Sequence, residues 1–139
     1  MYILTTKHHF DSAHFLKGYD GKCSNIHGHR WFIEVSVQSE ALIEDGCKRG
    51  MLVDFHTLKD DLKKECDHFD HKLIMEEGSL KEATEKALED EGFAMLRLPY
   101  RPTSENIAKY FHDYMTECGY QVKEVTCFET PENRATYTE

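Results

Sequence analysis

The chain has no long apolar run, no excess of basic charge and no cysteine framework, and each absence excludes a class of protein. No apolar segment approaches the roughly 20 residues of a membrane helix, and residues 1–7 contain no signal-peptide apolar region. A net charge of -9 argues against a nucleic-acid or anionic-membrane partner. The five cysteines are odd in number and scattered, which is typical of free thiols in a reducing cytoplasm.

Length and composition indicate one folded domain spanning residues 1–139. The chain has 139 residues, of which 40% are hydrophobic, and this is enough to bury a core. It contains no internal repeat, linker or low-complexity tract. We therefore expect a single globular unit rather than a disordered or modular chain.

The residue pattern predicts an α+β fold with an antiparallel sheet. Alternation predicts strands over 1–15, 27–38, 122–129 and 134–138, and a short strand over 51–53. Asp54 is a good N-cap for a helix that ends near Phe69, with Phe55, Leu58, Leu62 and Cys66 at helical spacing. Thr103 or Ser104 can cap a second helix that Gly119 ends. The charged segment 76–92 predicts an exposed helical excursion. Strands, two helices and further strands, in that order, favour helices on one face of an antiparallel sheet.

Three histidines near the N-terminus form the strongest functional signal. His27 and His29 lie two residues apart on a predicted strand, so both rings share one face, and His14 lies on the preceding strand. Three neutral imidazoles are a common ligand set for a catalytic zinc ion, although such sites also accept other transition metals. Packing alone explains this arrangement poorly, so we expect His14, His27 and His29 to bind a metal ion.

Cys23 has two metal-linked interpretations. As a fourth ligand it would close the site and make the metal structural. Near the metal but unligated, its thiolate could act as a base or nucleophile. Histidines two residues apart do not match zinc-finger spacing, which favours the second interpretation. An inert thiol remains the expectation for the other four cysteines.

Two acidic motifs are ambiguous on their own. In Asp70-His71 the carboxylate could orient the imidazole for proton transfer, but the neighbouring Asp67-His68 competes for this role. Glu129 is the last residue of a predicted strand and lies on the same face as Val125 and Cys127. A carboxylate there could bind an amino-pyrimidine edge through two hydrogen bonds, or it could simply be solvated.

Taken in order, these motifs resemble the 6-pyruvoyltetrahydropterin synthase family. The resemblance covers the chain from about Phe10 to Glu129 and includes His14, Cys23-x-x-x-His27-Gly28-His29, Asp70-His71, Pro102-Thr103-Ser104-Glu105-Asn106 and Glu129. The three residues between Cys23 and His27 are similar to the spacing in bacterial 6-carboxy-5,6,7,8-tetrahydropterin synthases of queuosine biosynthesis. The segment 76–99 looks longer than in compact members of the family.

The resemblance implies a role for each motif. His14, His27 and His29 would hold Zn²⁺, and Cys23 would be the general base. Asp70 and His71 would form a proton relay. Glu129 would anchor the pterin and belong to the catalytic set, with Ser104 and Glu105 near the same pocket. Lys22, Arg30, Lys72 and Arg134 are candidate triphosphate ligands, and the choice among them stays open.

The resemblance also implies an activity and an assembly. The substrate would be 7,8-dihydroneopterin triphosphate, which is converted with water to 6-carboxy-5,6,7,8-tetrahydropterin, acetaldehyde and triphosphate by a zinc-dependent lyase. The alternatives are a 6-pyruvoyl-type triphosphate elimination on that substrate and a non-catalytic zinc-stabilised binding module. The family fold is the tunnelling fold, an antiparallel sheet with two helices on one face. Three subunits close a barrel and two trimers stack into a homohexamer, with no nucleic-acid or membrane partner.

Overall fold

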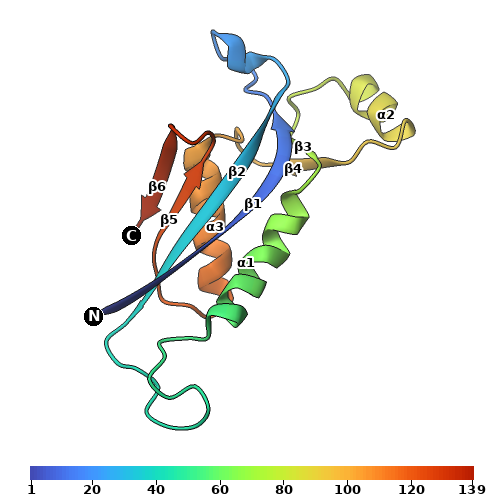
Figure 1. Cartoon of the computed structure of the whole chain (residues 1–139). Helices are drawn as coiled ribbons and strands as arrows, with labels where there is room; N and C mark the ends of the chain where they lie inside the picture. The colour runs from blue at the N-terminus through green and yellow to red at the C-terminus, as the bar shows by residue number, and fades with distance from the viewer.

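Two long antiparallel strands form the centre of the molecule. The structure is a computed structural model that describes residues 1–139. Strand β1 spans Tyr2–His14 and strand β2 spans His27–Ser39. They pair along their full length, from Tyr2 opposite Ser39 to His14 opposite His27. The connection between them contains one 3-10 turn, Lys22–Ser24. Both strands confirm the sequence prediction, and in Figure 1 they cross the middle of the molecule.

The full sheet has six strands in the order β4-β3-β1-β2-β5-β6. β5 (Val122–Phe128) and β6 (Arg134–Thr138) continue the antiparallel part beyond β2, as the sequence predicted. β3 (Leu73–Glu76) and β4 (Met95–Leu98) run parallel to β1 and to each other on the other side. β3 pairs with β1 only at Ala13 and His14, so the rest of that edge of β1 has no neighbouring strand within the chain.

Helices α1 (Phe55–Phe69) and α3 (Ser104–Glu117) cover one face of the sheet. The Asp54 side chain caps α1 by accepting a hydrogen bond from the His56 amide at 2.8 Å. Thr103 caps α3 in the same way through the Asn106 amide, at 3.3 Å. The two helices and their caps therefore confirm the sequence prediction.

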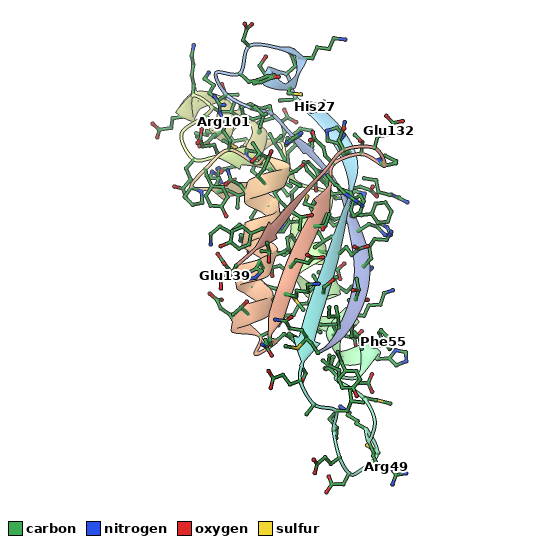
Figure 2. The ribbon with its side chains drawn as sticks, turned by 90° about the vertical axis from the view of Figure 1, so that its left-hand side faces the viewer. His27, Arg49, Phe55, Arg101, Glu132 and Glu139 are labelled. Atoms are coloured by element: carbon green, nitrogen blue, oxygen red, sulfur yellow. The ribbon has the colours of Figure 1, made fainter.

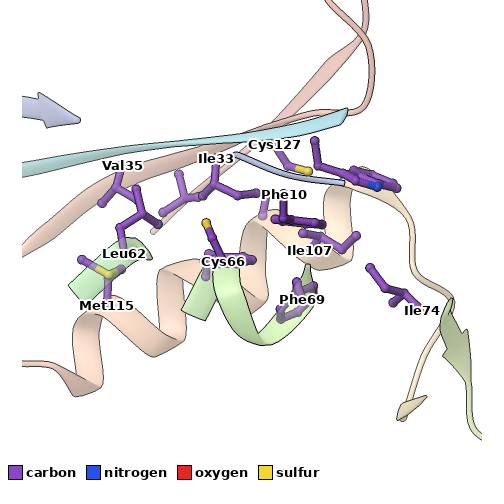
Figure 3. Packing of buried hydrophobic residues seen from close by; sticks show 14 of the residues in the cluster. Phe10, Ile33, Val35, Leu62, Cys66, Phe69, Ile74, Ile107, Met115 and Cys127 are labelled. Carbon is purple, nitrogen blue, oxygen red and sulfur yellow. The ribbon is translucent and has the colours of Figure 1, made fainter. Parts of the chain in front are cut away.

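The core lies between these helices and the sheet (Figure 3). β1 and β2 place alternate residues on this face, while each helix turns one apolar stripe toward it. Each fully buried large side chain contributes roughly 1.5–3 kcal/mol. The central members of the core are Phe10, Trp31, Ile33, Val35, Leu58, Leu62, Cys66, Phe69, Ile107, Phe111 and Met115. Phe55 departs from the expected stripe, because its side chain is exposed at the first turn of α1.

The charged segment 76–92, predicted as an exposed helical excursion, contains a third helix, α2 (Glu82–Asp90), which extends away from the body of the molecule. The short strands β3 and β4 on either side of it were not predicted. Arg97 of β4 holds α2 through ion pairs to Glu85 at 3.3 Å and Glu89 at 2.6 Å. None of the helices is long and apolar enough to cross a membrane.

The short strand predicted over residues 51–53 is wrong. The segment is an irregular loop before α1. Within it, the Met51 carbonyl accepts a hydrogen bond from the Ile43 amide at 2.9 Å, and the Met51 amide donates to the Lys48 carbonyl at 3.1 Å. Apolar residue types favour a strand, but a strand also needs a partner, and the sheet offers none at this position.

Candidate metal centre and pterin pocket

Strand pairing brings the three predicted metal ligands together at one end of the sheet. His14 is the last residue of β1 and lies directly opposite His27, the first residue of β2. Directly opposed residues in an antiparallel pair project from the same face, and His29 lies two residues further on that face. This end also carries the β5–β6 turn, as the positions of His27 and Glu132 in Figure 2 show, whereas Arg49 and Phe55 lie at the opposite end.

Backbone carbonyls orient two of the three rings. The Nδ1 atom of His14 lies 2.8 Å from the Pro102 carbonyl, and Nδ1 of His27 lies 2.7 Å from the Asn25 carbonyl. Each Nδ1–H therefore donates, which leaves the lone pair on Nε2. The two Nε2 atoms face each other at 3.0 Å. Two lone pairs at this distance repel unless a proton or a metal ion lies between them. A histidine that binds a metal through one ring nitrogen commonly donates its other N–H to a backbone carbonyl, as both rings do here.

Glu129, the residue immediately after β5, completes the cluster. Its Oε1 atom lies 2.9 Å from Nε2 of His29 and 3.4 Å from Nε2 of His14. The ligand atoms of these four residues all lie within 4.8 Å of one another. The His14 ring holds the pKa of the Glu129 carboxyl below its usual range, and burial lowers the pKa of His29. The carboxylate is therefore charged and the His29 imidazole neutral near pH 7, the states that a metal requires.

The donor set fits a transition metal. Zinc–nitrogen bonds of about 2.0–2.1 Å in a tetrahedral site place two nitrogen ligands roughly 3.3 Å apart, close to the separation of the His14 and His27 nitrogens. The buried Nε2 atom of His29 has no well-directed hydrogen bond despite its proximity to Glu129. A buried polar atom without a partner is costly, and a metal ion would satisfy it. The group of His14, His27, His29 and Glu129 could therefore hold a metal ion.

Asp70 and His71 form a second polar unit just after α1. One oxygen of Asp70 accepts a hydrogen bond from the His71 ring at 2.7 Å, and the other accepts from the Asp11 amide at 2.8 Å. Although burial acts to raise it, the pKa of Asp70 is lowered by these two hydrogen bonds. His71 has a positive φ of 55°, and its amide donates to the Asp11 carbonyl at 2.7 Å. The Asp70–His71 pair is thus fixed to β1, while the His71 imidazole remains 79% exposed.

An open groove of about 700 Å³ passes beside both units. Its lining includes His29 and His71, so a candidate metal ligand and the imidazole paired with Asp70 lie along one cavity. Leu88, Phe93 and Met95, which the sequence patterns did not single out, form an apolar wall. The available signal was the apolar run that follows Gly92 in the charged excursion.

The candidate triphosphate ligands differ in where they lie. Arg30 and Lys72 both line the groove. Arg30 is engaged by Asp11 through two hydrogen bonds of 2.9 and 3.0 Å. Lys22 and Arg134 are not among the residues lining the groove; Lys22 begins the 3-10 turn and Arg134 begins β6.

The remaining predicted site residues lie at different distances from the cluster. Ser104, the first residue of α3, donates a hydrogen bond to Oε2 of Glu129 at 3.3 Å. Glu105 is exposed in the first turn of the same helix, and the cluster of ligand atoms does not include it. Cys23 lies half-buried in the 3-10 turn before β2 and is outside the four-residue ligand group. The arrangement therefore does not favour Cys23 as the fourth metal ligand.

Comparisons with known proteins identify the family. The family model described as 6-pyruvoyl tetrahydropterin synthase matches residues 3–139. A protein of Haemophilus influenzae named 6-carboxy-5,6,7,8-tetrahydropterin synthase is 31% identical over 142 residues and covers 100% of both chains. One of Rickettsia bellii with the same name is 34% identical and covers 91% of this chain and 93% of its own. The Caenorhabditis elegans 6-pyruvoyl tetrahydropterin synthase structure has a TM-score of 0.66 at 27% identity, covering 100% of this chain and 97% of that one. The chain therefore belongs to the 6-pyruvoyl tetrahydropterin synthase family.

Proposed function

We propose that the protein is a zinc-dependent lyase that converts 7,8-dihydroneopterin triphosphate and water to 6-carboxy-5,6,7,8-tetrahydropterin, acetaldehyde and triphosphate. The observation that carries the proposal is the convergence of three histidine Nε2 atoms and the Glu129 carboxylate at one end of the sheet. The names of the relatives that are 31% and 34% identical support the carboxy branch of the family. The reaction would belong to queuosine biosynthesis in the cytoplasm.

The residues present suit the steps of this reaction. His14, His27 and His29 would hold the zinc ion, which supplies Lewis acidity that makes a C–H bond next to the substrate's side-chain oxygens acidic. Cys23 would accept that proton as general base. His71, oriented by Asp70, would return a proton to the substrate. Glu129 would bind the 2-amino and ring N–H groups of the pterin through charge-assisted hydrogen bonds, with Ser104 holding the carboxylate.

The second expected partner is another copy of this chain. Most of the outer edge of β1, and the outer edge of β6, have no neighbouring strand within the subunit. Unpaired edges favour pairing with another chain. We propose that subunits join through these edges to close a trimeric barrel, and that two trimers form a hexamer with the pockets at subunit interfaces. Light scattering of the purified protein tests this assembly, and a monomer at micromolar concentration would contradict it.

Product analysis tests the reaction. The zinc-loaded protein is incubated with 7,8-dihydroneopterin triphosphate, and acetaldehyde is measured with alcohol dehydrogenase while triphosphate is measured by ion chromatography. We expect the two products in equal amounts. Triphosphate without acetaldehyde would instead identify the 6-pyruvoyl-type elimination, which the family name and the 27% identical nematode structure keep as the alternative. Neither product would indicate a binding module and refute the proposal.

A further inference from the structure

The candidate metal site has four protein donors, one more than a catalytic zinc site usually offers. A catalytic zinc ion typically has three protein ligands and keeps its fourth position for water or substrate. Here the Glu129 carboxylate already occupies the space in front of the imidazoles, with Oε1 at 2.9 Å from His29 and 3.4 Å from His14. A metal ion bound by the three rings would lie within bonding reach of this oxygen.

The three imidazoles and the carboxylate are held very differently. The histidines belong to paired strands, and carbonyl groups fix the His14 and His27 rings. Glu129 lies beyond the end of β5, in the turn to β6, where its amide donates to the Asn133 carbonyl at 3.1 Å. Its side chain is 27% exposed, and its second oxygen has only the 3.3 Å contact with Ser104. The carboxylate can therefore leave without disturbing the sheet, whereas the rings cannot.

We propose that Glu129 is the fourth metal ligand of the substrate-free protein and moves off the metal when a reduced pterin binds. In the resting state Oε1 ligates the ion, and Ser104 holds Oε2 so that the carboxylate binds through one oxygen. The amino-pyrimidine edge then offers two N–H donors to the same carboxylate, and such a bidentate charge-assisted pair adds both energy and geometric specificity, so that it competes with the metal for Glu129. Substrate binding thus opens the coordination position that the chemistry needs. The displacement of Glu129 by a pterin rests on the proposed function, whereas its binding to the metal in the resting state does not.

Cobalt substitution and zinc affinity test the resting state. Visible absorption of the Co²⁺-loaded protein reports its ligand set directly, independent of turnover. The variant Glu129→Gln is compared with Glu132→Gln, which removes an exposed carboxylate from the same β5–β6 turn. We expect Glu129→Gln to change the cobalt spectrum and to weaken zinc binding, measured against a chelator, by at least the roughly 10- to 100-fold that is lost when a group supporting a metal ligand is removed. Glu132→Gln should match the unmodified protein in both measurements.

A pterin titration tests the opening step. 7,8-Dihydroneopterin, which carries the reduced ring and the side chain without phosphates, is added to both Co²⁺-loaded proteins. We expect a spectral change in the unmodified protein and a much smaller one in Glu129→Gln, where the carboxylate is already absent. Identical cobalt spectra and zinc affinities for the two proteins would overturn the inference even if acetaldehyde is produced. A changed spectrum without acetaldehyde production would uphold Glu129 as a ligand and refute the proposed function instead.

Discussion

Replacing Cys23 by alanine distinguishes between two roles of this residue, a catalytic thiol and a metal ligand. The cysteine lies outside the four-residue ligand group, so the variant should keep its metal. Its side chain is half-buried and makes no hydrogen bond, and its backbone carbonyl, which accepts from the Leu16 amide at 2.8 Å, remains in the variant. A fully buried methylene contributes about 0.8 kcal/mol, so the loss of stability should stay below about 1 kcal/mol.

Turnover should respond far more strongly. A positioned general base typically accelerates a reaction by about 10²- to 10⁴-fold, which corresponds to roughly 3–5 kcal/mol of the activation barrier. We therefore expect kcat for acetaldehyde release to fall by that factor, while zinc content per chain is unchanged and Tm falls by less than about 4 °C. Cys47→Ala is the matched control, because Cys47 is exposed and far along the chain in the loop before α1.

Two results would refute the reasoning. If Cys23→Ala retains turnover within tenfold of the unmodified protein, Cys23 is not the base. If it loses zinc or unfolds while Cys47→Ala does not, the thiol is a structural ligand and the binding-module alternative gains support. Zinc content, thermal unfolding and acetaldehyde release must be measured on the same preparations.

Three further substitutions probe the metal centre and the packing around it. His27→Ala should abolish turnover and reduce zinc affinity by well over 100-fold, beyond the loss of a supporting group, because one ligand is removed; zinc retained after dialysis would contradict this. Burial, with a hydrogen bond to Asp61, raises the pKa of Tyr120 above 10.0. The protonated side chain therefore stabilises the fold fully below pH 10, and this contribution is lost as pH rises further. In urea unfolding from pH 8 to 11, the free energy of unfolding of Tyr120→Phe should fall less with pH than that of the unmodified protein. His112 is 3% exposed with neither ring nitrogen hydrogen-bonded, and it packs edge-on against Tyr137. Because Phe keeps that packing and removes the unpaired nitrogens, His112→Phe should raise the free energy of unfolding by about 1 kcal/mol, and a fall would exclude the idea.

Local patterns predicted the parts of the fold that depend on local physics. The alternation in β1 and β2, the caps Asp54 and Thr103, and the stop at Gly119 were all readable, because each depends on a few adjacent residues. The four-residue strands β3 and β4 were not, since each is stabilised by parallel pairing with strands distant in sequence. The predicted strand over 51–53 failed for the complementary reason, namely apolar residues without a partner.

The candidate site was likewise predictable only in the parts that depend on local strand geometry. His27 and His29 share a face by strand geometry, and pairing with β1 adds His14, so spacing alone indicated the metal site. Glu129 was expected at the pterin, but its approach to the imidazoles depends on where β5 ends and on how the sheet orders its strands. The apolar wall of the groove, including Phe93, comes from the excursion around α2, whose placement no local pattern encodes.

The full-length pairing of β1 with β2 has a consequence for folding. The connection between the strands is a long loop with one 3-10 turn, so no tight hairpin sets their alignment. A slip of one residue would turn His27 and His29 to the face opposite His14, and the core residues of β2 with them. A metal ion that needs all three imidazoles stabilises only the native alignment. Metal binding would therefore favour the native alignment of β1 with β2 over a slipped one, so a chain that folds without the ion should pair these strands in the wrong register more often.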